Sequence, residues 1–291
     1  MREYVIMADS SCDLTAAEAT AMGITVLPLT FTVDGCEMKD TPGHAAMAPD
    51  EFFRRLSQGA ACSTSAANVG QFHDAMHAAL TEGKDVLCLC LSAALSTTYQ
   101  SAVIAATELA EEFPEAKIHV IDSASAARGS AMLLYRIVKE SEKEKDIDAL
   151  ANFAREAVKR QCGWFIVDDL NQLKRGGRIS AMTALAGTAL GIKPILAIDA
   201  QGALVAAGKV RGVKSAIKAL VDKVEEQRGE EQKDLPIFIS HADCPENVEY
   251  AAGLLRERFG EVEIREGYVG PVIGSHTGIG ALGIFFVGDK A

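Results

Sequence analysis

The sequence predicts an α/β fold in two domains, a mainly parallel sheet with helices followed by an α+β part with antiparallel sheet. Three observations lead to this prediction. The chain has 291 residues, whereas an average domain has about 150. Short apolar runs alternate with helical patterns over the first half, as in parallel sheets covered by helices on both faces. In the second half, hairpin signals separate the runs instead.

The first half provides the expected parallel strands. The apolar runs that precede helical patterns are residues 4–8, 86–91 and 118–121. The first helix begins at the capping box Thr15-x-x-Glu18, and the other two extend to about residues 110 and 140. A hairpin over residues 29–33, closed by Asp34-Gly35, and a short helix over 49–56 interrupt the alternation.

The pattern changes after the charged run 139–146 and the helix that follows it, so we expect domains over residues 1–160 and 161–291. Asp199-Ala-Gln-Gly202 predicts a hairpin between two strands, and helices are expected over 213–226 and 245–259, covering one face of an antiparallel sheet. Residues 271–288 are apolar, but they contain His276 and several glycines. We interpret them as strand and loop, because they are too polar for a membrane span.

Composition excludes several classes of protein. Hydrophobic residues make up 48% of the chain, which excludes disorder. The 40 acidic and 29 basic residues give a net charge of −11, so we expect no nucleic-acid binding and no stable membrane anchoring. The seven cysteines are scattered without a C-x-x-C pair, and we expect no secretory signal and a reducing, cytoplasmic location.

Three motifs resemble cofactor sites but lack the required context. Residues 278–283 match G-x-G-x-x-G, yet too little chain follows for the helix and strand of a dinucleotide site. Residues 202–209 have one residue too many between the glycines for a phosphate loop. His73 and His77 share a helix face, but no third ligand is placed to help them bind a metal ion. We therefore expect no bound cofactor and no metal.

Hydroxyl-rich segments are the more informative feature. They follow apolar runs at residues 62–65, 95–99 and 274–278, and Asp-Ser pairs follow two predicted parallel strands at 9–10 and 122–123. Ligands bind at the carboxyl edge of such sheets, and converging O–H and N–H donors suit a carboxylate or phosphate. Helix capping is the alternative explanation for each segment.

Basic and nucleophilic groups suggest two further sites. Lys174-Arg-Gly-Gly-Arg178 precedes Ile179-Ser180 at an expected helix start, where basic groups favour an anion; a solvated loop is the alternative. Ser96, His276 and Asp9 could form a hydrolytic triad, although no G-x-S-x-G elbow is present.

Seven segments, in order along nearly the whole chain, resemble the DegV family, the fatty-acid-binding subunits of bacterial fatty acid kinase. They are Ala8–Leu14, Ser63–Ser65, Leu95–Ala102, Asp168–Ser180, Ile192–Ile195, Lys209–Gly212 and Gly274–Gly283. The resemblance implies a Rossmann-like N-terminal domain, an α+β C-terminal domain and a long-chain fatty acid held between them. It also implies a separate ATP-dependent kinase subunit that phosphorylates the fatty acid for phospholipid metabolism.

The resemblance assigns site residues by position. Thr64 and Ser96 match the hydroxyls that hold the carboxylate, and His276 matches the histidine beside it. The neighbours of these three residues in the expected site are Ser65, Thr97, Thr277 and Gly278.

This chain departs from the family pattern at four positions, namely Ala66, Ala67, Thr97 and Ile279. Threonine at 97 replaces a glycine, which predicts a slightly different backbone beside Ser96.

The leading hypothesis is therefore a non-catalytic carrier that presents a fatty-acid carboxylate to a kinase. We expect Arg178 and Arg211, each beside a glycine, to face the partner or the phosphoryl group, because arginine recognises such groups bidentately. The alternatives are a stand-alone serine hydrolase that uses Ser96 and His276, and a binding module for another apolar carboxylate. Chain length, unsaturation and oligomeric state stay open at this point.

Overall fold

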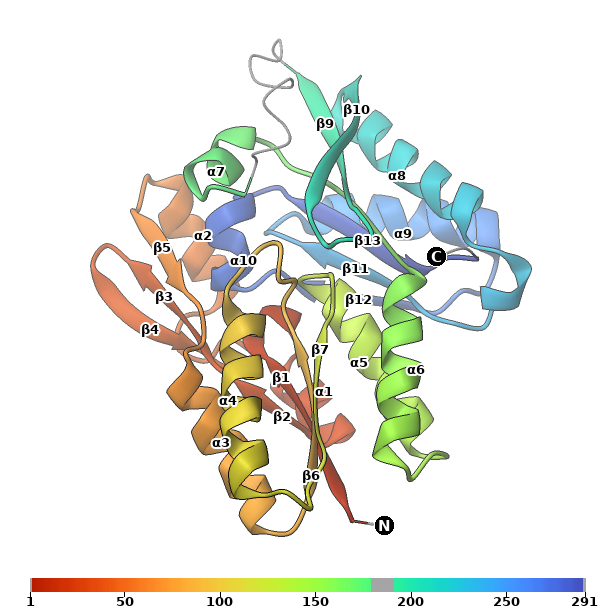
Figure 1. Ribbon diagram of the computed structural model, residues 1–291. Coiled ribbons are helices and arrows are strands. Elements are labelled where there is room, and N and C mark those ends of the chain that lie inside the picture. Colours follow the sequence, from red (N-terminus) through yellow and green to blue (C-terminus); the bar gives the residue numbers. More distant parts are fainter. Residues whose placement is uncertain (1, 179–190, 290–291) are drawn as a thin grey trace.

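A parallel sheet of four strands forms one half of the molecule, in the order β2-β1-β6-β7. The computed structural model describes residues 2–178 and 191–289, and Figure 1 shows this sheet in the lower part of the molecule. Its strands are β1 (Tyr4–Asp9), β2 (Ile24–Leu27), β6 (Asp85–Cys90) and β7 (Ile118–Asp122). The predicted runs are thus confirmed as parallel strands, and β2 joins them.

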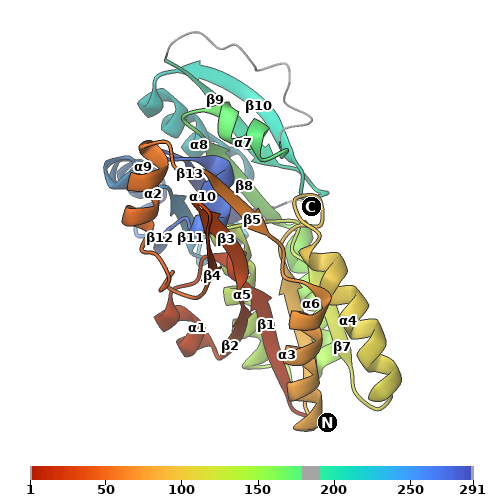
Figure 2. The same ribbon diagram turned by 90° about the vertical axis from the view of Figure 1, so that its left-hand side faces the viewer.

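Helices cover both faces of this sheet. One face carries α3 (Val69–Thr81) and α4 (Thr98–Glu112), and the other carries α1 (Ala16–Met22) and α6 (Ile147–Lys159). The capping box of Thr15 and Glu18 begins α1 as predicted. Figure 2 shows α3 and α4 together on one side of the strands.

A small antiparallel sheet, β4-β3-β5, lies beside the parallel sheet. The predicted hairpin is confirmed, because β3 (Leu29–Val33) and β4 (Cys36–Asp40) pair across the turn at Asp34 and Gly35. β5 (Cys62–Ser65) pairs with β3 on its other side. The predicted short helix is α2 (Pro49–Ser57), with proline in its first turn.

The second half contains a six-stranded sheet in the order β10-β9-β8-β13-β11-β12. Its strands are β8 (Gln161–Ile166), β9 (Ile192–Ile198), β10 (Leu204–Arg211), β11 (Ile237–His241), β12 (Ile264–Tyr268) and β13 (Leu282–Val287). The hairpin predicted at Asp199 joins β9 to β10. The expected antiparallel sheet needs one correction, because β11 and β12 pair in parallel across the intervening helix and the sheet is therefore mixed.

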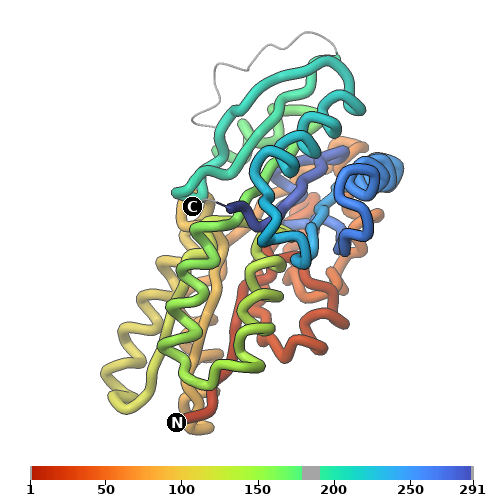
Figure 3. The backbone as a smooth tube through the Cα atoms, turned by 90° about the vertical axis from the view of Figure 1, so that its right-hand side faces the viewer, coloured from red at the N-terminus to blue at the C-terminus, as the bar shows by residue number. Residues whose placement is uncertain are grey.

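Helices lie on both faces of the six-stranded sheet, whereas the sequence predicted one covered face. α8 (Val213–Gln227) and α9 (Pro245–Phe259) pack on one face, and α5 (Arg128–Ser141) packs on the other. Successive residues of β13 point to opposite faces. Ile284 belongs to the hydrophobic core under α8 and α9, and Phe285 belongs to the core under α5. In Figure 3, α5 and α6 lie side by side below this sheet.

The segment 271–288 also differs from the prediction of strand and loop. It begins with the helix α10 (Pro271–Thr277) and continues as β13. Proline occupies the first turn of α10, where its missing N–H is not needed. Gly274 lets the helix approach closely, because a Cβ there would lie 2.8 Å from Phe53 of α2.

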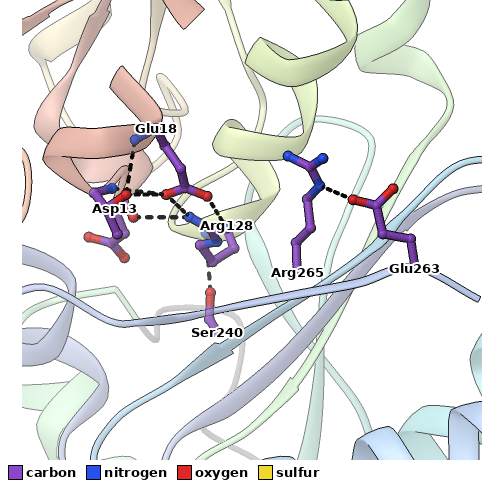
Figure 4. A network of polar contacts seen from close by, with 7 residues as sticks. Asp13, Glu18, Arg128, Ser240, Glu263 and Arg265 are labelled. Atoms are coloured by element: carbon purple, nitrogen blue, oxygen red, sulfur yellow. Dashed lines mark hydrogen bonds and ion pairs between the residues drawn. The ribbon is translucent and has the colours of Figure 1, made fainter. Parts of the chain in front are cut away.

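A buried arginine joins the helix α1 to the six-stranded sheet (Figure 4). The Arg128 side chain, 1% exposed, donates to both carboxylate oxygens of Glu18 at 2.7 and 2.6 Å. Its backbone N–H donates to Ser240 Oγ of β11 at 3.1 Å. The start of α5 is therefore fixed to both halves of the protein.

Candidate functional site

A cavity of about 590 Å³ lies between the carboxyl edge of the parallel sheet and the six-stranded sheet. This volume is within the range of about 300–1,000 Å³ for small-molecule sites. Apolar side chains form most of its wall, among them Leu91, Phe165, Ile198, Leu204, Val272 and Phe285. The cavity therefore suits a ligand that is largely apolar.

The two Asp-Ser pairs organise the loops at this edge. Asp9 Oδ2 accepts from the backbone N–H of Leu91 at 2.6 Å. Asp122 Oδ1 accepts from Ala93 N at 3.2 Å and from Ala124 N at 2.8 Å. The carboxylates thus hold the loops after β6 and β7 in the shape that lines the cavity.

Thr64, Ser96, Arg178 and His276 all line this one cavity. They come from β5, the loop before α4, the turn after α7 (Leu170–Arg175) and α10, respectively. Thr64 Oγ1 and His276 Nε2 are 2.8 Å apart. Two of the three hydroxyl-rich segments therefore meet directly, although 212 residues separate the contacting side chains.

His276 is a neutral imidazole at physiological pH. Burial lowers its pKa to about 4, and the nearby Arg178 guanidinium adds to this effect. Its Nδ1 is buried and has no hydrogen-bond partner within the described part of the chain. We assign the proton to Nε2, because a positive neighbour favours a lone pair on Nδ1 and buried orphan N–H groups are rare.

This tautomer determines how Thr64 is oriented. Nε2–H of His276 donates to Thr64 Oγ1, which leaves the hydroxyl proton of Thr64 free to donate to a ligand. An anion in the cavity would receive that hydrogen bond, and the imidazole would polarise it.

Ser96 lies in a helix-capping turn. Its Oγ accepts from Thr98 N at 3.2 Å and lies 2.8 Å from Thr98 Oγ1. Ser96 therefore both caps the start of α4 and lines the cavity. Thr97 has φ −78°, a conformation open to any residue, so threonine fits at this position without backbone strain.

Three of the four predicted neighbours of Thr64, Ser96 and His276 line the cavity, and the fourth does not. Ser65, Thr97 and Thr277 line the cavity, and the Thr277 hydroxyl donates to Ile273 O within α10 at 3.2 Å. Gly278 ends α10 with φ +76° and is not a lining residue.

The four departures from the family pattern have different surroundings. Ala66 lines the cavity, whereas Ala67 is buried in the core with α3 and α4. Ile279 is exposed, and Thr97 begins α4 beside the cavity. Of the four, only Ala66 and Thr97 line the cavity and can alter its shape directly.

The two predicted arginines lie in different places. Arg178 lines the cavity, its Nε donates to Leu95 O at 3.1 Å, and its Nη1 donates to Gly176 O. Arg211 is exposed on β10, outside the cavity wall. The helix start expected at Ile179-Ser180 lies outside the described residues.

The contacts of a hydrolytic triad are not present among the described residues. His276 Nε2 contacts Thr64, and Ser96 Oγ contacts Thr98. Asp9 accepts from Ser11 and Leu91 and does not hold the imidazole. The alternative of a serine hydrolase therefore has no support from the geometry.

Sequence reasoning missed the apolar wall and the role of Gly176. A Cβ on Gly176 would lie 2.2 Å from His276 Nδ1, so only glycine allows this close approach. The sequence analysis singled out residues 174–178 for their positive charge. In the structure, Gly176 of this segment provides the space that the His276 ring occupies.

His276 should make stability depend on pH. Its pKa is below the value in the unfolded chain, so the unfolded state binds a proton first as pH falls, and stability is lost from about pH 6.5 down to about pH 4. This contribution should reach about 3 kcal/mol. Urea denaturation of the ligand-free wild type and His276→Gln across this range should show the smaller pH dependence in the variant; equal profiles would contradict the prediction.

None of the helices described for this chain combines the length and the apolar composition that crossing a bilayer requires.

His73 and His77 stack on the surface with ring centroids 5.8 Å apart, and His77 contacts Glu112.

Comparison with known proteins gives one consistent result. Residues 3–289 match the model of a family described as uncharacterised proteins of the DegV family. A DegV domain-containing protein of Clostridium perfringens is 37% identical over 289 residues, which is 99% of each chain.

Solved structures agree. A fatty-acid-binding DegV family protein from Thermus thermophilus superimposes with a TM-score of 0.87 at 29% identity, covering 99% of this chain and 100% of that one. DegV from Bacillus subtilis, described as a fatty acid binding protein, gives a TM-score of 0.84 at 25% identity over 99% and 100% of the two chains.

Proposed function

The chain belongs to the DegV family, and on this premise we propose that it binds a long-chain fatty acid and presents the carboxylate to a separate kinase subunit. The observation that carries the proposal is an apolar cavity with Thr64, Ser96, Arg178 and His276 in its wall. The names of the relatives from Thermus thermophilus and Bacillus subtilis, which describe fatty-acid binding, support it.

Burial of the acyl chain supplies the affinity. Each buried CH₂ contributes about 0.8 kcal/mol, so about 14 methylenes contribute roughly 11 kcal/mol against association costs of at least about 4 kcal/mol. Micromolar or tighter binding follows from this difference alone.

The carboxylate then fixes the position of the ligand. Its lost hydration must be replaced by hydrogen bonds, and the hydroxyls of Thr64 and Ser96 are available donors. Because His276 is neutral, Arg178 supplies the positive charge among the described residues of this part of the cavity wall. Binding therefore relies on hydroxyl donors oriented by the imidazole, with the guanidinium supplying positive potential.

We expect Thr64→Ala, Ser96→Ala and His276→Ala each to weaken fatty-acid binding by about 1–3 kcal/mol, since each leaves a buried carboxylate short of one hydrogen bond or of its orientation. The double variants should lose less than the sum of the singles, because the donors share one anion. Isothermal titration with palmitate provides the measurement. Thr107→Ala, which removes an exposed hydroxyl bonded only to its own helix, is the matched control.

Unchanged affinity in all three variants would place the carboxylate elsewhere. Native mass spectrometry of the purified chain, followed by identification of the released small molecule, checks the ligand class independently. Release of a different apolar carboxylate would overturn the fatty-acid proposal, and ester turnover lost in Ser96→Ala would restore the hydrolase alternative.

The kinase step belongs to a second protein in this proposal, because neither glycine-rich segment has the spacing of a phosphate loop. An acidic carrier needs a local basic group for a partner that handles phosphate. Arg211 is exposed on β10, the edge strand of the six-stranded sheet, and Arg178 is partly buried in the cavity wall.

Arg211→Ala should keep fatty-acid binding and reduce acyl-phosphate formation in an assay reconstituted with the kinase subunit. Arg178→Ala should reduce the same activity, with some loss of stability because its bond to Leu95 O is removed. Melting temperature, binding and phosphorylation are measured on the same preparations. Normal phosphorylation in both variants would contradict the assignment of these arginines.

A further inference from the structure

Asp13, Asp40 and His44 form a fully buried cluster away from the cavity, and their relative exposures are 2%, 0% and 8%. Asp13 follows η1 (Ser10–Cys12) at the end of β1, and Asp40 ends β4. His44 lies in the loop between β4 and α2. One ligand atom from each residue can be chosen so that all three lie within 4.8 Å of one another.

The polar atoms of this cluster are incompletely paired. His44 Nδ1 contacts Asp40 Oδ1 at 2.9 Å, and Asp13 Oδ1 accepts from the backbone N–H of Gly270 at 3.1 Å. Oδ2 of Asp13 and Oδ2 of Asp40 are both buried and have no partner within residues 2–178 and 191–289. Buried carboxylate oxygens without partners are costly and indicate a missing ligand.

We propose that Asp13, Asp40 and His44 bind one divalent transition-metal ion, for which Zn²⁺ is the natural probe. Three donors no more than 4.8 Å apart leave a central point within about 2.8 Å of each, near the metal–ligand distances of about 2.0–2.6 Å. Two carboxylates and one imidazole suit zinc, and the ion neutralises both buried negative charges.

The ion would link three separate parts of the chain. The first parallel strand, the small antiparallel sheet and the segment at Gly270 meet at this cluster, and α10, which carries His276, begins at the next residue. The site is thus structural, and it is independent of the fatty-acid proposal because none of its ligands lines the cavity.

Metal ligation requires ionised carboxylates and a neutral imidazole, so protons compete with the metal ion and its binding should weaken as pH falls.

The test uses the full chain carrying His77→Ala, which removes the exposed histidine pair as an adventitious site. After treatment with a chelator, the protein is incubated with Zn²⁺, dialysed and analysed for bound metal. We expect about one equivalent of zinc and, at saturating metal, a rise in melting temperature of about 5–10 °C. Asp13→Asn and Asp40→Asn, which keep the size of the side chains, should each abolish both effects.

Zinc retained equally by both asparagine variants, or no zinc bound and no change in melting, would overturn the proposal. In the second case the cluster is held by hydrogen bonds alone, and Asp13→Asn should then melt at or above the wild-type temperature. A second measurement does not depend on whether the asparagine variants fold. Co²⁺ is bound to the chain that retains Asp13, Asp40 and His44, and its visible absorption spectrum is recorded. Visible d–d bands without a thiolate charge-transfer band support the site, whereas a thiolate band assigns the metal to cysteine.

Discussion

Arg128→Ala should lower the free energy of unfolding by about 3–5 kcal/mol, the usual result of breaking a buried ion pair by removing one partner. The guanidinium lies over the ring of Phe238, 5.4 Å from its centroid, and binds both oxygens of Glu18. Alanine would leave that half-buried carboxylate without its cation and, among the described residues, bonded only to Thr15, and it would also leave a void where the arginine side chain is packed.

Arg265→Ala is the matched control, because Arg265 forms an exposed pair with Glu263 at 2.7 Å (Figure 4). A surface pair contributes at most about 1 kcal/mol. Urea denaturation of both variants measures the difference, and a double-mutant cycle with Glu18→Gln isolates the ion pair itself. A loss in Arg128→Ala no larger than in Arg265→Ala would show that the buried contact does not stabilise the fold.

Gly176→Ala adds only one methyl group, yet it should weaken ligand binding about as much as the removal of a hydrogen-bonding side chain. The new methyl group would lie 2.2 Å from His276 Nδ1, a distance that forces the ring to turn away from Thr64. We expect fatty-acid binding to weaken by about 2 kcal/mol, roughly thirtyfold. The crowding should also destabilise the fold by about 1–3 kcal/mol.

Gly253→Ala is the control for this change, since the glycine lies in α9 with open space around its Cα. Alanine there should raise stability by up to about 1 kcal/mol, because glycine is a poor helix former. Isothermal titration and thermal melting of the two variants decide the question. Unchanged binding in Gly176→Ala would mean that the imidazole does not help to hold the carboxylate.

The distances between residues in the sequence limited what could be predicted about the site. Each hydroxyl-rich segment could be identified because small polar residues after an apolar run stand out locally. That Thr64 lies near His276 was implied only by family resemblance, because nothing in residues 65–275 specifies the contact. The expectation of no metal rested on His73 and His77, for which no third ligand is placed, whereas Asp13, Asp40 and His44 are brought together only by the fold.

Sequence patterns were enough to predict the local structure, namely strands of the parallel sheet, the capping box at Thr15 and the hairpins at Asp34 and Asp199, and also the family of the chain. These follow from periodicity, caps and turn residues, which act over a few positions. Three features became visible only in the folded chain: β12 pairs in parallel with β11, residues 271–277 form a helix, and Arg178 lies beside a neutral His276. Pairing, burial and the electrostatic field depend on which distant segments pack together, so they are properties of the folded chain as a whole.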